Sequence, residues 1–187
     1  MADSDTPKPG SGPLPGARGR VIEALRRLHA EIDAGAAEVA RRNADRLQCG
    51  RGCADCCVDD LEVFELEAWN IRLAHAGLLA TEAPHPPGAC AFLDANRCCR
   101  IYRERPYVCR TQGLPLRWFE DPNERGQAVE RRDICPLNLE GIPLENLSGD
   151  SCWTLGPVEA RLAALQDRFD PQERTRVRLR DLFRRPG

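Results

Sequence analysis

Ten cysteines among 187 residues are the feature of this sequence with the most evident chemistry. Eight of them fall into two groups, Cys49, Cys53, Cys56 and Cys57, then Cys90, Cys98, Cys99 and Cys109, while Cys135 and Cys152 stand apart. Closely spaced cysteines in a reducing compartment are more often metal ligands or redox groups than disulfides. Glycines around the first group indicate a loop, and loops can wrap thiolates around a soft or borderline metal ion. The sequence therefore predicts a metal centre, in preference to thiol redox chemistry or core filling by small side chains.

The cysteine spacing favours an iron–sulfur cluster over a single zinc ion. A zinc ribbon needs two CxxC pairs, and only Cys53 and Cys56 form one here. The adjacent Cys56 and Cys57 have diverging side chains, so they suit two metals or two irons of a larger cluster. An all-cysteine set without a nearby histidine also fits iron–sulfur ligation. Zinc is the alternative cofactor.

The segment CGRGCADCC, followed by CAFLDANRCCRIYRERPYVCR, resembles the YkgJ-like or CxxCxxCC cysteine-cluster family, which is described as zinc- or iron-chelating. The resemblance covers residues 49–136 and implies eight metal ligands: Cys49, Cys53, Cys56, Cys57, Cys90, Cys99, Cys109 and Cys135. Cys98 is an extra cysteine in this alignment. Cys49 departs from the family spacing, because three residues rather than two separate it from Cys53.

The same resemblance implies that Tyr102, Arg105 and Arg110 surround the ligands. A metal–thiolate centre is anionic, so a guanidinium can donate N–H bonds to sulfur or to nearby carbonyls. The competing hypothesis is that Arg110 pairs with a carboxylate such as Asp94 and acts only through packing.

Three kinds of enzyme site are excluded or disfavoured by the residues present. Cys49, Cys53 and Cys56 have the spacing of a radical S-adenosylmethionine motif, but Asp55 stands where an aromatic residue is usual, and the chain is too short for the barrel such enzymes use. Lys8 is the only lysine and precedes a proline, so neither a GK[ST] phosphate loop nor a Schiff base is expected. A redox or protein-modifying role and a zinc-binding structural or metal-carrier module without catalysis both stay open.

Apolar periodicity predicts the helices that must position these loops. Residues 20–48 form an amphipathic helix, or two helices broken near residues 33–35. Residues 61–80 form a short strand or turn that leads into another helix, with Phe64, Trp69, Ile71 and Leu73 as core candidates. Residues 157–169 form a third helix that starts at Pro157.

The strands are expected in the cysteine-rich half. Residues 94–97 are expected to make a tight, hairpin-like turn, and residues 114–120 and 127–133 to form two strands around a turn. Together these elements predict a single α+β domain, mostly helical, with a short β-hairpin and cysteine-rich loops stapled by metal.

Composition indicates the domain boundaries, the compartment and the classes of partner. We expect a disordered leader at 1–18, the cysteine-cluster domain at 19–170, and an Arg-rich C-terminal tail or helix at 171–187. The net charge of −2 and the lack of a long apolar run predict a cytoplasmic protein without a membrane or nucleic-acid partner. The identity of a protein or small-molecule partner does not follow from the sequence.

Overall fold

The computed structural model describes residues 16–120, 128–172 and 174–184, which form the mostly helical α+β architecture expected from the sequence. The leader expected at 1–18 lies outside the described residues up to position 15, and its end already belongs to the first helix. The turn expected between the two strands of the hairpin also lies outside them.

The α-helices and strands alternate irregularly along the chain. The helices are α1 (Ala17–Arg42), α2 (Glu65–Ala74), α3 (Ala76–Thr81), α4 (Tyr107–Thr111) and α5 (Pro157–Phe169). The strands are β1 (Glu62–Phe64), β2 (Leu116–Glu120), β3 (Val129–Asp133), β4 (Trp153–Thr154) and β5 (Arg176–Arg178). Short 3₁₀ turns are η1 (Tyr102–Glu104), η2 (Pro136–Asn138), η3 (Leu144–Asn146), η4 (Gly149–Ser151) and η5 (Leu179–Phe183).

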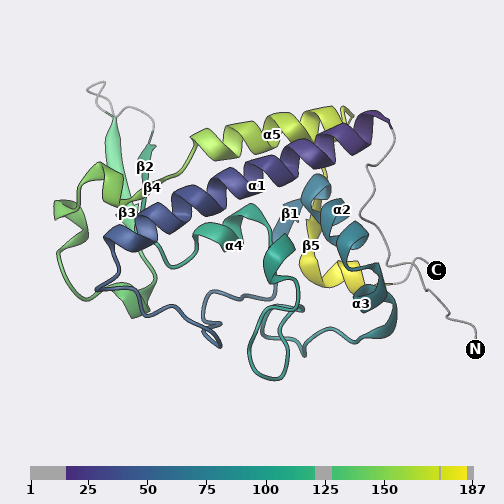
Figure 1. Cartoon of the computed structure of the whole chain (residues 1–187), viewed down its shortest axis with the longest axis horizontal. Helices are drawn as coiled ribbons and strands as arrows, with labels where there is room; N and C mark the ends of the chain where they lie inside the picture. The colour runs from purple at the N-terminus through teal and green to yellow at the C-terminus, as the bar shows by residue number, and fades with distance from the viewer. Residues whose placement is uncertain (1–15, 121–127, 173, 185–187) are drawn as a thin grey trace, which may run out of the picture.

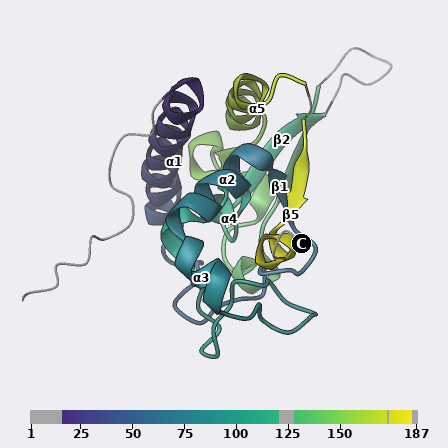
Figure 2. The ribbon, with the colours of Figure 1, turned by 90° about the vertical axis from the view of Figure 1, so that its right-hand side faces the viewer.

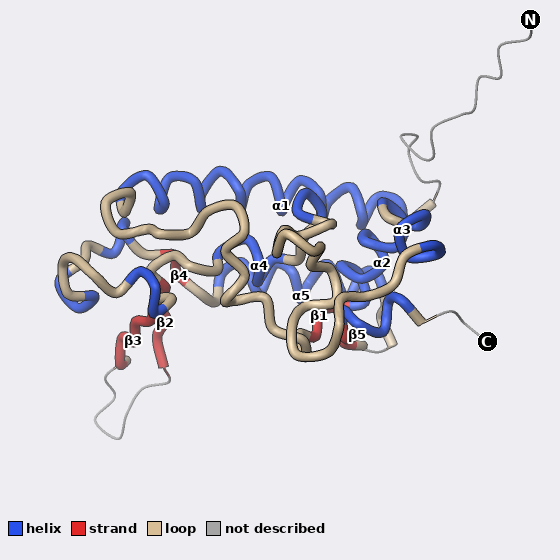
Figure 3. The backbone as a smooth tube through the Cα atoms, turned by 90° about the horizontal axis from the view of Figure 1, so that it is seen from below, coloured by secondary structure: helices blue, strands red, loops and turns tan. Residues whose placement is uncertain are grey.

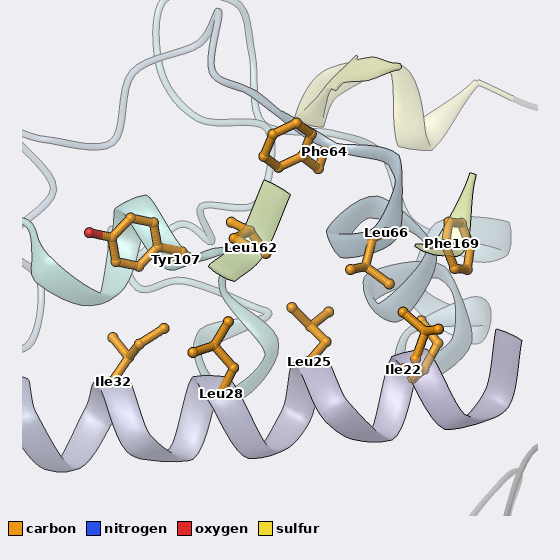
Figure 4. Packing of buried hydrophobic residues seen from close by; sticks show 10 residues of the cluster. Ile22, Leu25, Leu28, Ile32, Phe64, Leu66, Tyr107, Leu162 and Phe169 are labelled. Atoms are coloured by element: carbon orange, nitrogen blue, oxygen red, sulfur yellow. The ribbon is translucent and has the colours of Figure 1, made fainter. Parts of the chain in front are cut away.

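The long helix α1 is the scaffold of the molecule, and α5 lies beside it (Figures 1 and 2). Its apolar side chains recur at helical spacing on one face and are buried: Ile22, Leu25, Leu28 and Ile32. Figure 4 shows this face turned toward side chains of the other helices, namely Leu66, Tyr107, Leu162 and Phe169. Burial of each such side chain contributes roughly 1.5–3 kcal/mol, so this contact holds the helices together.

The helix α1 is continuous through residues 33–35, where the sequence allowed a break. Gly35 is there because the ring of Trp153 packs against the helix backbone: a Cβ at position 35 would lie 2.9 Å from Cζ3 of Trp153. The ring is held in place, since its Nε1 donates to the hydroxyl of Tyr107 at 3.0 Å. The glycine therefore permits a close contact and does not end the helix.

A second core lies next to the first, around α2, α3 and η5: Leu66 of α2 belongs to the first core, and Ala68 and Ile71 belong to the second. The antiparallel pair of β1 and β5 brings the C-terminal segment against α2, and Leu179 and Leu182 are buried there. Residues 171–187, expected as a tail or helix, thus contain a strand and a packed 3₁₀ turn within their described part. The cause is the pairing of Val63 with Val177, a long-range contact that local composition does not reveal.

The expectation of a buried Trp69 and Leu73 is wrong, whereas Phe64 and Ile71 are buried as predicted. The buried face of α2 includes two polar residues, Glu67 and Asn70, which sequence hydrophobicity would place outside. Because Glu67 and Asn70 take up part of the buried face of α2, Trp69 and Leu73 lie on its exposed face.

The predicted hairpin is confirmed: β2 pairs with β3 antiparallel, and β4 adds to β2 in parallel. The turn predicted at 94–97 is closed by a single bridge between Leu93 and Cys99. Figure 3 shows that loops cover the side of the molecule opposite α5, and the cysteine-rich segments belong to these loops. None of the helices in the described ranges is long and apolar enough to cross a membrane.

The contact of Gly35 with Trp153 predicts opposite effects for two glycine-to-alanine changes in helices. Alanine usually stabilises a helix interior by roughly 1 kcal/mol relative to glycine. Gly77 in α3 has open space around it, so Gly77→Ala should raise the free energy of unfolding by about that amount. Gly35→Ala should lower it by ~1–3 kcal/mol, because the new methyl group overlaps the Trp153 ring. Urea denaturation of both variants measures the difference, and equal gains would show that Trp153 does not pack here.

Candidate metal centre

Hydrogen bonds between loops bring the cysteine-bearing segments together. The loop at 49–57 follows α1, and the carbonyl of Cys57 accepts a bond from the backbone N–H of Cys90 at 2.9 Å. Cys99 follows the turn that starts in the same segment, and Cys109 lies in α4. Three stretches of chain that are remote in sequence, 49–57, 90–99 and α4, therefore lie close together.

Four of the predicted ligands form a first set, which we call the deep set: Cys57, Cys90, Cys99 and Cys109. Cys90 is buried and the other three are partly buried. Cys90 belongs to the second hydrophobic core, and Cys57 and Cys99 pack against it. Burial raises the pKa of Cys90, Cys99 and Cys109, and a negative charge on Cys90 or Cys99 would raise that of Cys109 further. These thiols are therefore electrostatic neighbours that stay protonated until a cation replaces the protons.

Cys49 occupies a built seat between η2 and the end of α4. The side-chain N–H of Asn138 donates to its sulfur at 3.3 Å, which favours the thiolate, although burial raises the pKa of this thiol overall. Gly113, with φ of +88°, leaves room for the sulfur, because a Cβ there would lie 2.6 Å from it. Asn138 is fully buried and also donates to the carbonyl of Gly113 at 2.7 Å, while its oxygen accepts from the backbone of Gln48 at 2.8 Å.

A second set of thiols gathers around this seat. A charge on Cys53, Cys135 or Cys56 would raise the pKa of Cys49, so these three are its electrostatic neighbours. The carbonyl of Cys135 accepts a bond from the backbone N–H of Asn138 at 2.8 Å, which links Cys135 to the residue that contacts Cys49. We call Cys49, Cys53, Cys56 and Cys135 the shallow set: Cys49 and Cys56 are exposed, and Cys53 and Cys135 are partly buried.

The adjacent Cys56 and Cys57 lie where the two sets meet. A hydrogen bond from Cys57 lowers the pKa of Cys56 to about 6, and the same bond raises the pKa of Cys57. Cys56 and Cys135 also line a cavity of about 360 Å³, together with Gln112, Asp133 and Ile134.

The donor chemistry of these residues fits a thiophilic metal. Eight sulfurs in two groups of mutual neighbours form an all-thiol donor set, and the seat made by Gly113 and Asn138 accommodates one of them. Across the ranges that the structure describes, no three histidine, cysteine, aspartate or glutamate side chains are arranged so that they could hold one ion. A metal would therefore have to draw the loop thiols together, as is usual for sites whose ligands come from separate segments.

Two cysteines lie apart from both sets. The thiol of Cys98 is 3.6 Å from the carbonyl of Asn96 in the turn. Cys152 is buried, and the groups that shift its pKa are arginines and a glutamate, after burial itself. Neither is among the cysteines whose charge would shift the pKa of Cys49, Cys57, Cys99 or Cys109.

The helix α4, which carries Cys109, is anchored by buried charges. Glu67 of α2 accepts the backbone N–H of Tyr107 at 2.7 Å. Arg110 is buried and donates to Asp33 of α1 at 2.5 Å, to the carbonyl of Arg103 at 2.9 Å, and lies 3.2 Å from Nδ1 of His29. The carboxylate partner of Arg110 is thus Asp33 and not Asp94, whose oxygen accepts bonds from its own turn.

The other two residues expected around the ligands lie at the edge of the site. Arg105 donates to Asp33 at 3.0 Å and to the carbonyl of Tyr102, and its guanidinium stacks 4.2 Å from the ring of Tyr102, which is exposed. The positive charge of Arg105 partly opposes the rise that burial causes in the pKa of Cys99. In the described part of the chain, neither Arg105 nor Arg110 hydrogen-bonds to a cysteine sulfur, so their predicted contact with a metal centre stays a prediction.

Sequence reasoning missed Gly113, Asn138, Asp33 and Glu67. Asn138 lies 89 positions from Cys49, and no spacing rule connects them. Gly113 follows the RPxxCR pattern closely and could have been noticed as a position that needs a left-handed backbone.

Comparison with known proteins agrees with the cysteine pattern. A family model described as "CxxCxxCC: Putative zinc- or iron-chelating domain" matches residues 48–136. The searches of curated proteins and of solved structures found no match.

The seat of Cys49 predicts an energetic coupling between Gly113 and Cys49. Gly113→Ala should lower the free energy of unfolding by ~1–3 kcal/mol more than Gly88→Ala. Both glycines have a positive φ, but the surroundings of Gly88 are open, so this control carries only the backbone strain. Urea denaturation of the metal-free variants measures both effects. In a Cys49→Ala background, the excess cost at Gly113 should vanish, and an excess that persists would contradict the contact.

The anchoring of α4 predicts that Arg110 cannot be replaced by lysine without loss of stability. Lysine keeps the charge but cannot reach Asp33 and the carbonyl of Arg103 together, so Arg110→Lys should cost ~1–3 kcal/mol. Arg161→Lys is the matched control, since its ion pair with Glu31 is exposed and should matter by less than about 1 kcal/mol. Equal unfolding midpoints for the two variants would contradict the anchoring role.

Proposed function

Residues 48–136 of this chain belong to the CxxCxxCC family of zinc- or iron-chelating domains, and from this premise we propose that its cysteine loops hold an iron–sulfur cluster. The observation that carries the proposal is the convergence of Cys57, Cys90, Cys99 and Cys109 from three separate segments in one partly buried region, with Cys56 as a further neighbour. Four cysteine thiolates are the usual ligand set of such a cluster.

The crowding of the thiols supports a bound cation. Several thiolates close together repel one another and lose hydration, as the raised pKa of Cys109 reflects. A metal centre bound to all four offsets that cost. The core of an iron–sulfur cluster carries about the same net charge as one zinc ion, so the preference for the cluster rests on the cysteine spacing, with one CxxC pair and two adjacent cysteines, and not on charge. Zinc bound by the same cysteines is the alternative.

The chain's own residues would protect and position such a centre. The core residues Phe92 and Ile101, both fully buried, keep water from one side of the deep set. The pair of Arg110 with Asp33 holds Cys109 in place from the other side. A bound iron–sulfur cluster supplies one-electron redox chemistry, and its potential depends on this burial and on nearby hydrogen bonds.

Metal analysis of protein purified without oxygen tests the proposal. The expected result is iron with acid-labile sulfide and broad visible absorption. A colourless protein that contains zinc would replace the cluster by the alternative, and a protein without either metal would refute metal binding by these cysteines.

Removal of the metal should also loosen the fold, because its ligands come from separate segments. If the metal contributes ~4 kcal/mol, chelation should lower the melting temperature by roughly 8–16 °C. Differential scanning calorimetry before and after chelation measures this shift. Complete metal loss with an unchanged melting temperature would contradict a structural contribution.

A further inference from the structure

One arginine side chain in the C-terminal turn η5 is surrounded by hydrogen-bond acceptors. Nη1 of Arg180 donates to the carbonyl of His85 at 2.7 Å, and Nη2 donates to those of Ala89 at 2.9 Å and Pro86 at 3.3 Å. Nε donates to the carboxylate of Asp59. A guanidinium presents its five N–H donors in one fixed plane, so it can hold several acceptors at set directions. We call Arg180 and these four acceptors the Arg180 clamp.

The acceptors of the clamp belong to the two segments that carry Cys57 and Cys90. Asp59 lies two residues after Cys57, and Ala89 directly precedes Cys90. The two segments also bind each other, since the backbone N–H of Gly88 donates to Asp59 at 2.9 Å and that of Cys90 donates to the carbonyl of Cys57 at 2.9 Å. The clamp therefore closes the contact at which two predicted metal ligands meet.

The loop at 82–91 has few hydrogen bonds of its own to fix its shape. It contains neither helix nor strand, and its three prolines lack a backbone N–H. Its ends are joined by the N–H of His85, which donates to the carbonyl of Ala91 at 2.9 Å. The three carbonyls of the clamp take their donor from another part of the chain, so the shape of the loop depends on Arg180.

The turn η5 presents Arg180 from a fixed position. Leu179 and Leu182 are buried in the second core, and the backbone N–H of Leu179 donates to the carbonyl of Leu61 at 3.0 Å. The side chains of Arg180 and Asp59 are only 23% and 20% exposed, so their ion pair is less screened by water than a pair at the surface.

We propose that Arg180 is a positioning residue for the metal centre. It fixes the loop that leads into Cys90 against the segment of Cys57, so that these two predicted ligands lie next to each other before a metal binds. The inference rests on the proposed function, since it takes both cysteines as ligands, and it holds for a cluster and for zinc alike. Arg180 lies beyond residue 136, where the match to the family model ends, so the family domain depends on a contact from outside it.

The exchange of one backbone N–H and the loss of bound metal measure this role. The N–H of Cys90 joins the two ligand segments, so its hydrogen exchange reports how often they separate. In full-length Arg180→Ala protein, purified without oxygen, this exchange should be ~10-fold faster than in the wild-type chain, because the hydrogen bonds of the clamp are lost. Transfer of the bound metal to an excess of a strong chelator should be faster by a similar factor.

Three further variants separate positioning from overall stability. Ile22→Val removes a methyl group from the first hydrophobic core and lowers the stability of the whole fold without touching the clamp, so both rates should stay within about twofold of the wild-type values. Arg178→Ala removes an exposed ion pair with Glu62 and should also leave both rates unchanged. Arg180→Lys keeps the charge but not the fork of donors, so it should raise both rates by ~3-fold and serves as the test if Arg180→Ala does not fold.

The spectrum of the bound metal gives an independent reading. Circular dichroism of the sulfur-to-metal transitions depends on how the ligands are oriented around the metal. These bands should change in Arg180→Ala and stay as in the wild-type protein in Ile22→Val.

The outcomes separate the two proposals. Equal effects of Arg180→Ala and Ile22→Val on both rates would show that Arg180 contributes only to overall stability, and unchanged rates in Arg180→Ala would show that it contributes nothing. Either result, in protein that holds its metal, overturns the positioning role and leaves the proposed function intact. Wild-type protein that purifies with neither iron nor zinc refutes the proposed function, whatever the exchange rate of the Cys90 N–H.

Discussion

A charge pair between α1 and α4 is the contact on which the whole cysteine region depends. The Arg110 side chain is only 2% exposed, whereas that of Asp33 is 42% exposed, so removal of Asp33 would leave a buried guanidinium without its carboxylate partner. Cys109 directly precedes this arginine, and Gly113, which admits the sulfur of Cys49, follows three residues later. One short helix therefore connects both cysteine sets to the scaffold.

Burial of sulfur gives the site its dependence on a cation. A thiol in an apolar place holds its proton, and each further thiolate nearby makes ionisation harder, as the raised pKa values of Cys90, Cys99 and Cys109 indicate. Binding of a cation must therefore displace several protons. In the shallow set the directions differ: the hydrogen bond from Cys57 lowers the pKa of Cys56 to about 6, whereas burial raises the pKa of Cys49.

The fold was predictable where local pattern decides it. The helix at 157–169 and the hairpin of β2 with β3 follow from periodicity and turn residues. The strand β5 was not, because it exists only through its pairing with β1. Spacing and family resemblance named eight cysteines, but they could not reveal Asn138 or Asp33, whose roles arise from contacts across 89 and 77 positions. Long-range polar contacts of this kind leave no local pattern in a sequence.

The different exposure of the cysteines also bears on whether this protein could bind a substrate. A closed site surrounded by core residues can stabilise a fold or carry electrons, but it offers no place for a substrate. An open site needs a ligand position that faces a cavity, and Cys56 and Cys135 are the thiols that border one. The wall formed by Leu114 and Ile134 is apolar, while Gln112 and Asp133 offer polar groups. Cys56 and Cys135 are therefore the two predicted ligands that a molecule in this cavity could contact.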